Sequence, residues 1–354
     1  MAQAVSPGEK LSCLERSLVT LVQASFPLVS RPFEALGRLV GSTEAAVLKQ
    51  VTGLKEKGFV RKIGPVFEPA RFGISSELMA VQVTPEELAR VGAAVSVWRP
   101  VTHCYAREHS VNLWLAALSS ERQWFEQARA HTLDMAGVKG VWRLPALRRF
   151  KVAVRFDLTG HPKPEGESPS TTTGEKKTAP PAQPISGRPD RIDLRLLAAL
   201  EADLPLCPEP FSALAQDRGL EEATILGALQ QWTADGRIRR YGALVRHMQL
   251  GFVANAMTVW DVPPERVETV GSSLASSSYV SHCYERSPFP GFPFNLYAMV
   301  HERSWERCLA VIDELSRACG DCRRVILLST NEFKKSSPKY AELLAGSIRS
   351  PEET

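Results

Sequence analysis

The feature that most constrains the fold of this chain is an internal repeat. Arg61-Lys62-Ile63-Gly64 recurs as Arg239-Arg240-Tyr241-Gly242, 178 residues later. His103-Cys104-Tyr105-Ala106-Arg107 recurs as His282-Cys283-Tyr284-Glu285-Arg286, 179 residues later. Ordered matches at an almost constant offset indicate two copies of one unit, so one architecture must be built twice.

Residues 161–190 separate the two copies. This stretch is rich in Pro, Ser, Thr and Gly, has no aromatic residue, and contains Ile185 as its only large aliphatic residue. Such a segment cannot bury enough apolar surface to offset the entropy lost on ordering. We therefore predict a flexible linker there.

Within each copy, a helical pattern comes first and strand patterns follow. Apolar spacing in the first copy predicts helices over 11–25, after Pro32, and from the cap pair Ser42-Thr43 to Gly58, with an extended segment at 59–67. Three short helices with a β-ribbon are typical of a winged helix-turn-helix. The later residues predict strand, helix, strand, strand, helix and strand at 78–83, 85–95, 101–105, 111–118, 121–135, and 138–144 with 150–156. This is the βαββαβ order of a ferredoxin-like domain.

The predicted fold class is therefore α+β, with two copies of a winged helix-turn-helix plus a ferredoxin-like βαββαβ domain forming an intrachain pseudo-dimer. The predicted domains are a winged helix-turn-helix at 1–60, a ferredoxin-like domain at 61–160, the linker at 161–190, a second winged helix-turn-helix at 191–240, a second ferredoxin-like domain at 241–340, and a C-terminal tail at 341–354.

The charge pattern argues against nucleic acid as the main partner. The chain has 43 Lys+Arg against 39 Asp+Glu, a net charge of +4, which is weak for a protein that grips phosphate backbones. The third predicted helix of the second copy, residues 221–235, contains no Lys or Arg and has acids at both ends. A helix of this kind repels a duplex, so DNA binding is not expected.

The sequence also bears on the compartment. No apolar run approaches the roughly 18 residues that span a bilayer, and the first residues do not resemble a secretory signal. The seven cysteines are expected to be reduced thiols. We therefore expect a cytoplasmic protein without a membrane partner.

A row of polar side chains recurs on one predicted strand of each copy. Residues two apart on a strand share a face, so the three side chains of each row point the same way: His103, Tyr105 and Arg107, and then His282, Tyr284 and Arg286. His109 continues the first row if the strand does. Burying such groups without partners costs several kcal/mol. They suit a cavity for an anionic ligand, in which Arg binds carboxylates, His moves a proton or binds a metal, and Tyr donates a hydrogen bond.

The other interpretation of these rows is structural. The six groups could satisfy one another at the interface between the copies. That both copies keep all three residue types favours a binding or catalytic site. Cys104 and Cys283 should point to the opposite strand face and pack in the core. The lone Cys319-Gly-Asp-Cys322 is interpreted as a turn with reduced thiols.

The motifs in full resemble those of siroheme decarboxylases, a family related to the Lrp/AsnC regulators. The matching segments run from His103 to Trp114 and from His282 to His301, each after a basic-basic-x-Gly turn. The resemblance covers nearly the whole chain outside the linker. The first copy resembles the D-type subunit and the second the L-type subunit, as in fused D/L forms. It implies a carboxy-lyase that converts siroheme to 12,18-didecarboxysiroheme by loss of two acetate carboxylates, in haem d1 or alternative haem biosynthesis.

The resemblance and the residue chemistry together predict the site. His103 and His282 are the candidate proton donors, or axial ligands to the substrate iron, and Tyr105 and Tyr284 complete the catalytic set. The predicted substrate-binding residues are Arg107, Arg286, Arg61, Arg239, Arg240, His109, Asn112, Trp114, Asn295, His247 and Lys151. No cofactor beyond the iron of the siroheme substrate is implied. G/H-type decarboxylase subunits or further copies of the chain are the candidate protein partners.

An Lrp/AsnC-type DNA-binding transcriptional regulator with a small-molecule or haem effector is the alternative function. A regulator should bind specific duplex DNA, whereas the enzyme should release carbon dioxide from siroheme.

Overall fold

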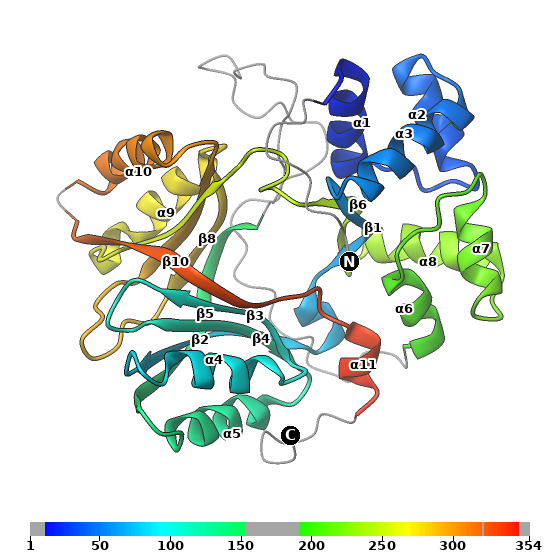
Figure 1. Cartoon of the computed structure of the whole chain (residues 1–354). Coiled ribbons are helices and arrows are strands. Elements are labelled where there is room, and N and C mark those ends of the chain that lie inside the picture. Colours follow the sequence, from blue (N-terminus) through cyan, green and yellow to red (C-terminus); the bar gives the residue numbers. More distant parts are fainter. Residues whose placement is uncertain (1–10, 153–191, 321, 347–354) are drawn as a thin grey trace. The chain divides into compact units, whose positions relative to one another are not determined.

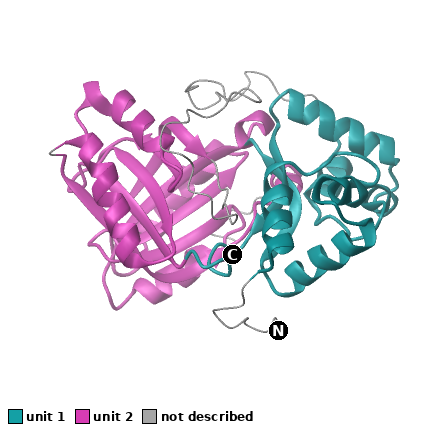
Figure 2. Ribbon diagram, turned by 90° about the horizontal axis from the view of Figure 1, so that it is seen from above, with its two compact units in different colours: residues 1–68, 155–177, 191–252 teal, residues 69–154, 178–190, 253–354 magenta. Residues whose placement is uncertain are grey.

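The computed structural model describes residues 11–152, 192–320 and 322–346, and the predicted linker lies outside these ranges. The chain divides into two compact units, coloured separately in Figure 2. Of the described residues, 11–68 and 192–252 form one unit, called here the helical unit, and 69–152 and 253–346 form the other, the barrel unit. Each unit therefore takes one part from each sequence copy.

The helical unit contains three helices from each copy (Figure 1). The first copy supplies α1 (Cys13–Ala24), α2 (Pro32–Val40) and α3 (Glu44–Glu56), as predicted. Ser12 and Glu15 form a capping box at α1, and Thr43 caps α3 by accepting a hydrogen bond from the backbone N–H of Ala46. The second copy repeats the pattern with α6 (Leu194–Glu201), α7 (Pro210–Gln216) and α8 (Glu222–Ala234).

The ribbon of the helical unit is shared between the copies. β1 (Val60–Phe67) pairs antiparallel with β6 (Ile238–Val245), with Gly64 opposite Gly242. The ribbon expected in each winged helix-turn-helix thus forms between the copies, because each copy supplies one strand. The predicted boundaries at 60/61 and 240/241 fall inside these strands, and the compact units instead divide after Glu68 and Phe252.

The barrel unit is a closed eight-stranded β-barrel. Its strands are β2 (Ser75–Val83), β3 (Val101–Arg107), β4 (Leu113–Ser119), β5 (Val138–Val152), β7 (Ala254–Trp260), β8 (Val280–Arg286), β9 (Leu296–Glu302) and β10 (Arg324–Lys335). Around the barrel they follow the order β10-β3-β4-β2-β5-β8-β9-β7. Strands β3 and β8, which carry the two polar rows, are therefore on opposite sides of the barrel.

Helices complete the predicted βαββαβ order in both copies. They are α4 (Leu88–Ser96) and α5 (Arg122–Leu133) in the first copy, and α9 (Val267–Ser276) and α10 (Trp305–Cys319) in the second. Short 3-10 helices η1 (Pro69–Phe72) and η2 (Pro264–Arg266) precede β2 and α9. Helix α11 (Tyr340–Leu344), whose Tyr340 and Leu343 are buried, overlaps the start of the segment predicted as a C-terminal tail, of which residues 347–354 lie outside the described chain.

The long strands β5 and β10 join the two copies. β5 pairs with β2 over 138–145 and continues along β8 over 146–152. β10 pairs with β7 over 324–328 and then with β3 over 329–335. The sequence predicted two strands in place of β5, because Pro145 and the polar residues after it interrupt the apolar pattern. The strand instead continues through this region by changing its hydrogen-bonding partner; residues 153–156 lie outside the described chain.

Three apolar clusters form the core of the barrel unit. One lies between the sheet and helices α4 and α5, and includes Cys104, and the equivalent cluster under α9 and α10 includes Cys283. This confirms the predicted core position of both thiols. The third cluster contains only strand and loop residues, Trp114, Phe292 and Tyr297 among them, and lies inside the barrel.

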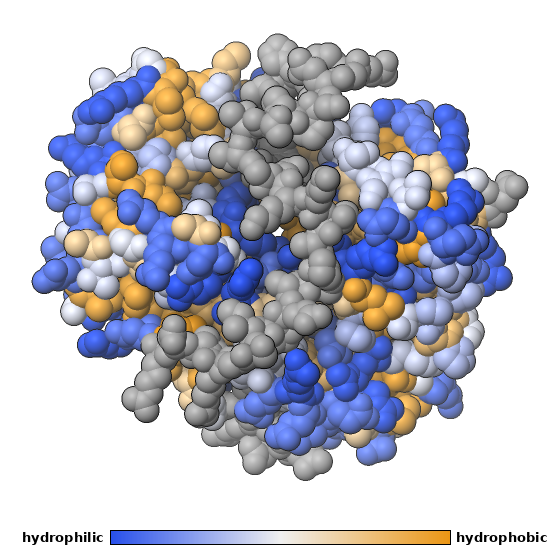
Figure 3. Space-filling model, turned by 180° about the vertical axis from the view of Figure 1, so that it is seen from behind, coloured by the Kyte–Doolittle hydropathy of each residue, from blue (hydrophilic) through white to orange (hydrophobic). Residues whose placement is uncertain are grey.

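The surface is mixed in character. Figure 3 shows hydrophilic and hydrophobic residues interspersed over the face in view. Among the described residues, no helix combines the length and the apolar composition required to cross a membrane.

Candidate functional site

Both polar rows face the barrel interior. Tyr105 lies opposite Trp114, and Tyr284 lies opposite Tyr297, with both partners belonging to the interior cluster. Cross-strand neighbours share a face of the sheet, so the two tyrosines also point inward. The ring centroids of His103 and Tyr105 are 6.3 Å apart, as are those of His282 and Tyr284. The predicted common face of each row is confirmed.

A β-bulge sets the first residue of each row. The pairing of β3 with β4 leaves Thr102 as an extra residue, and the pairing of β8 with β9 leaves Ser281 as its counterpart. A bulge re-aims side chains, and here it brings each hydroxyl to the following imidazole. Thr102 Oγ1 lies 2.9 Å from His103 Nδ1, and Ser281 Oγ lies 2.9 Å from His282 Nδ1. Each hydroxyl therefore fixes the orientation of one imidazole ring.

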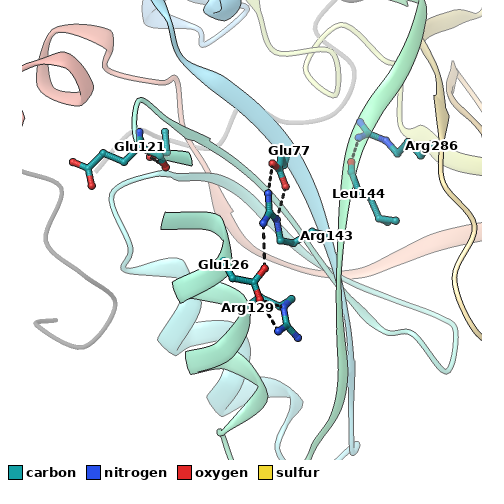
Figure 4. A network of polar contacts seen from close by, with 8 residues as sticks. Glu77, Glu121, Glu126, Arg129, Arg143, Leu144 and Arg286 are labelled. Atoms are coloured by element: carbon teal, nitrogen blue, oxygen red, sulfur yellow. Dashed lines mark hydrogen bonds and ion pairs between the residues drawn. The ribbon is translucent and has the colours of Figure 1, made fainter. Parts of the chain in front are cut away.

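Arg107 and Arg286 end the rows as buried cations. Their exposed fractions are 7% and 9%. Arg107 Nη1 donates to the Leu327 carbonyl at 2.7 Å and to Ser329 Oγ at 3.1 Å. Arg286 Nη1 donates to the Leu144 carbonyl (Figure 4). Both guanidinium groups thus hold strand backbone of the other copy.

The two guanidinium groups have no carboxylate partner in the described chain. Glu77, which acts electrostatically on Arg286, is paired with Arg143 at 2.7 Å (Figure 4). The Nε atoms of Arg107 and Arg286 are buried without a hydrogen-bond partner among the described residues. Burial lowers the pKa of Arg107 to about 10 and also lowers the pKa of Arg286. Arginine keeps its charge at neutral pH, so these groups are uncompensated buried cations.

Aromatic rings accompany both cations. The Arg107 guanidinium carbon lies 5.6 Å from the Tyr105 ring centroid, and that of Arg286 lies 4.8 Å from the Tyr284 ring centroid. Cation–π contacts of this kind contribute about 0.5–2 kcal/mol, which is less than the cost of burying an unpaired charge. The Tyr297 hydroxyl is also buried without a partner among the described residues. The interior therefore offers unsatisfied positive charge and an O–H donor, which suits an anionic ligand.

Asn112, Asn295 and Trp114 belong to the framework. Asn112 exchanges two hydrogen bonds with the backbone of Val83, at 2.8 and 3.0 Å, and Asn295 does the same with Val262. Trp114 is 2% exposed, and its Nε1 donates to the Val111 carbonyl at 2.9 Å. The structure thus does not support the sequence-based assignment of these three as substrate ligands, because strand backbone and core packing occupy them.

His109 and Lys151 lie in the barrel unit with different surroundings. β3 ends at Arg107, so His109 does not continue the row as a strand residue. Its Nδ1 accepts a hydrogen bond from the Val111 N–H at 3.0 Å, its ring lies 5.4 Å from Phe292, and burial lowers its pKa. Lys151 Nζ donates to the Ser277 carbonyl at 2.6 Å. A role in substrate binding stays a prediction for both.

The remaining predicted ligands, Arg61, Arg239, Arg240 and His247, lie in the helical unit. Arg239 Nη2 donates to the Phe67 carbonyl at 3.0 Å, and Arg240 donates to the Gln23 carbonyl. The two arginines thus bind backbone, and a role in substrate binding stays a prediction for all four residues.

Sequence reasoning assigned no role to Ser281, Thr102 or His301. In the second copy, Ser281 Oγ lies 2.8 Å from His301 Nε2 as well as beside His282. His301 stood in the quoted motif, but its place beside Ser281 depends on the bulge, which the sequence pattern did not reveal.

The described residues contain no cluster of side chains that would form a metal site. They include no group of three or more His, Cys, Asp or Glu side chains that could hold an ion. All seven cysteines are free, and Cys322 Sγ donates to the Cys319 carbonyl at 2.8 Å. This fits the interpretation of the C-x-x-C pair as a turn.

The fold and the two rows define a two-copy protein with AsnC-like ligand-binding domains. Family models described as AsnC-like ligand binding domain match residues 71–151 and 249–334, and models described as siroheme decarboxylase NirDL-like HTH domain match residues 15–61 and 193–239. The chain belongs to the siroheme decarboxylase family.

Individual relatives match either nearly the whole chain or somewhat less than half of it. A siroheme decarboxylase of Hydrogenobacter thermophilus is 32% identical over 324 residues, covering 91% of this chain and 93% of the relative. The siroheme decarboxylase beta subunit of Methanosarcina barkeri is 38% identical over 147 residues, covering 42% of this chain and 97% of the subunit. The crystal structure of the siroheme decarboxylase NirDL in co-complex with an iron-uroporphyrin III analogue matches with a TM-score of 0.67 and 28% identity, covering 93% of this chain and 95% of that chain.

Proposed function

We propose that this chain is a siroheme decarboxylase that removes two acetate carboxylates of siroheme as carbon dioxide and yields 12,18-didecarboxysiroheme. The observation that carries the proposal is the pair of buried guanidinium groups, Arg107 and Arg286, which lack a carboxylate partner among the described residues. Siroheme carries several carboxylates on one macrocycle, so it can supply the missing negative charge to both. This anionic requirement comes from the site itself and is independent of the family match.

The arginines bind carboxylates that are retained. A guanidinium forms charge-assisted hydrogen bonds with a carboxylate, each contributing about 1.5–3 kcal/mol. Arg107 and Arg286 use one Nη each on strand backbone and keep Nε for a ligand. The departing carboxylate loses its charge in the transition state, so an arginine that stabilised it would slow the reaction. Arginines that bind only the retained carboxylates hold the substrate without this cost.

The reaction needs an electron sink and an acid. Breaking the C–C bond to the carboxylate releases carbon dioxide and leaves an electron pair on the methylene carbon, which the conjugated macrocycle delocalises. The carbon then takes up one proton and becomes a methyl group. We assign the donation of that proton to His103 and His282, and Tyr105 and Tyr284 stack beside them to orient or donate. The Tyr105 hydroxyl donates to Glu332 Oε2 at 3.1 Å in this structure.

The iron belongs to the substrate, and no further cofactor is needed by this chemistry. Either histidine can also serve as an axial ligand to the substrate iron through a ring nitrogen. We propose haem d1 or alternative haem biosynthesis as the setting, in the cytoplasm. The Methanosarcina relative is a subunit whose length corresponds to about one copy, whereas this chain contains two copies. We propose G/H-type subunits or further copies of this chain as its protein partners.

The regulator alternative is not supported. In α8, at the position of a recognition helix, no residue between Glu222 and Ala234 is Lys or Arg. Base edges and phosphates in a duplex are contacted mainly by such cations and by amides.

The proposal is tested by incubating the purified chain with siroheme in the absence of oxygen and following the tetrapyrrole by mass spectrometry. The expected product has lost two carboxyl groups. Unchanged siroheme, together with salt-dependent binding of a specific DNA duplex, would reject the proposal in favour of the regulator.

A further inference from the structure

Both bulge hydroxyls donate to a carbonyl of the neighbouring strand, which is that of Met299 at 3.4 Å for Ser281 Oγ, but Ser281 also has a second imidazole partner. In the second copy, Ser281 Oγ lies 2.8 Å from His301 Nε2 on β9. In the first copy, Thr102 Oγ1 donates to the Ala116 carbonyl at 3.2 Å. The residue one place beyond the matched pair is His301 in the second copy and Leu118 in the first. One copy therefore has two imidazoles joined by a hydroxyl, and the other has a single imidazole.

We propose that the second copy delivers the proton in decarboxylation, and that Ser281 and His301 form a relay that reloads His282. This inference rests on the proposed function and deepens it by distinguishing the two histidines of the rows. His301 and Ser281 are relay residues in this account, because they act on the substrate only through His282. His103 lacks this route for replacing a donated proton.

The geometry supports transfer through the hydroxyl. Ser281 Oγ is 2.9 Å from His282 Nδ1 and 2.8 Å from His301 Nε2, both within hydrogen-bond distance. A serine hydroxyl can donate one hydrogen bond while it accepts another, so it can connect two imidazoles. The bulge makes this possible by placing Ser281 on the same side as His282.

The strand β9 sets the far end of the relay. Alternate residues of a strand share a face, so His301 lies on the side of Met299 and of the interior residue Tyr297. The backbone N–H of His301 donates to the Tyr279 carbonyl at 3.2 Å, which fixes this part of the strand. His301 is partly exposed, whereas Leu118 is 7% exposed and has no titratable group. The second copy therefore has a titratable group behind Ser281 that can hold the replacement proton, and the first copy has none at the equivalent position.

The proton count balances. His282 gives the Nε2 proton to the methylene carbon, which carries the electron pair left by carbon dioxide. The Ser281 hydroxyl gives its proton to His282 Nδ1, and His301, which starts as an imidazolium, gives its Nε2 proton to the hydroxyl. His282 ends as the other neutral tautomer, Ser281 is unchanged, and His301 ends neutral and must regain a proton before the next turnover.

Two substitutions break the relay, and one preserves it. Ser281→Ala removes the hydroxyl, and His301→Leu installs the residue of the first copy. Each should lower kcat by about 10–100-fold, which is less than the 10²–10⁴-fold of general acid–base catalysis because His282 itself is retained. KM and the siroheme affinity, measured by visible-absorption titration, should stay within about twofold of wild type, since the relay assigns both residues to proton transfer and not to substrate binding. Ser281→Thr should keep most of kcat, because it retains a hydroxyl and the first copy has Thr102 at this bulge.

The matched control is His131→Gln, which removes an imidazole from α5 on the outer side of the barrel and should leave kcat unchanged. Full kcat in Ser281→Ala or in His301→Leu would overturn the relay while leaving the decarboxylase function intact. The relay is also overturned if Ser281→Thr is as slow as Ser281→Ala, or if kcat falls only together with siroheme affinity. Absence of turnover by the wild-type chain would instead reject the proposed function.

Discussion

The ring of Phe150, near the end of β5, packs directly on the Cα of Gly271 in α9. A Cβ atom on Gly271 would lie 2.5 Å from Phe150 Cε2. Phe333, near the end of β10, makes the equivalent contact with Gly92 in α4, where a Cβ would lie 2.5 Å from Phe333 Cε2. Each long strand thus ends on a helix of the other copy, and the two contacts fasten the closed barrel.

Substitution of either glycine should therefore weaken the fold. Gly271→Ala and Gly92→Ala place a methyl group against a ring in a packed interface, at a cost of roughly 1–3 kcal/mol in the free energy of unfolding. Urea denaturation measures this change. Gly53→Ala is the control, because an added Cβ in α3 meets no atom within 4 Å and alanine favours helix by about 1 kcal/mol. Equal stability of Gly271→Ala and wild type would show that the ring contact does not constrain the barrel.

Removal of a buried guanidinium should weaken siroheme binding far more than it weakens the apoprotein. Arg107→Gln or Arg286→Gln removes an uncompensated buried charge, so the loss of its hydrogen bond to backbone is partly offset, and we expect the free energy of unfolding to change by about 1 kcal/mol or less. Loss of a charge-assisted contact to substrate should raise the siroheme Kd by about 10–100-fold. Absorption titration and thermal unfolding measure the two quantities.

The control for this experiment is Arg148→Gln. Arg148 is a half-exposed arginine of β5 that pairs with Glu268 and Glu285. Its removal should leave siroheme affinity within about twofold, since exposed ion pairs contribute little. An unchanged Kd in Arg107→Gln and Arg286→Gln would contradict the assignment of the buried cations to the substrate.

Loss of an imidazole from the rows should affect turnover without unfolding the chain. General acid catalysis contributes about 10²–10⁴-fold, so His282→Ala should lower the decarboxylation rate within that range. His103→Ala should lower it less if the second copy delivers the proton. Steady-state rates with siroheme, beside thermal unfolding curves, provide the measurement. Near-normal rates in both variants would reject a catalytic role for the rows.

The cysteines should differ sharply in reactivity. Burial raises the pKa of Cys104 to about 11 and the pKa of Cys283 to about 12, so both are protonated at pH 8, whereas Cys13 is exposed. Only a thiolate attacks iodoacetamide at a useful rate. Native protein at pH 8 should therefore be alkylated at Cys13 and spared at the two buried sites, as read by peptide mass spectrometry. Rapid labelling of Cys283 would indicate that the sheet opens under α9.

Local pattern was enough to predict much of the fold. Some features depend only on residues close together in sequence: the cap at Thr43, the helix after Pro32 and the two inward rows. In these segments a spacing of two residues defines one face of a strand, and a spacing of three to four defines one face of a helix. The pairing of β1 with β6 and the extension of β5 along β8 could not be predicted, because the partner strand lies in the other copy and no local signal identifies it.

The site followed the same division. His103, Tyr105 and Arg107 were found because they alternate along one strand. Asn112 resembled a ligand in the sequence, but its amide is used by the backbone of Val83, which is 29 residues away. His301 was overlooked because the bulge at Ser281 shifts the alternation by one residue, and only the pairing with β9 reveals it.

The most direct test of the central claim is the release of carbon dioxide from siroheme, compared between the wild-type chain and the Arg107→Gln/Arg286→Gln double variant. The account predicts two molecules of carbon dioxide per siroheme for the wild-type chain. When the rates are compared at a siroheme concentration below the wild-type Kd, it predicts a loss of at least about 100-fold for the folded double variant. Equal release by the two proteins, or none by the wild-type chain, would contradict it.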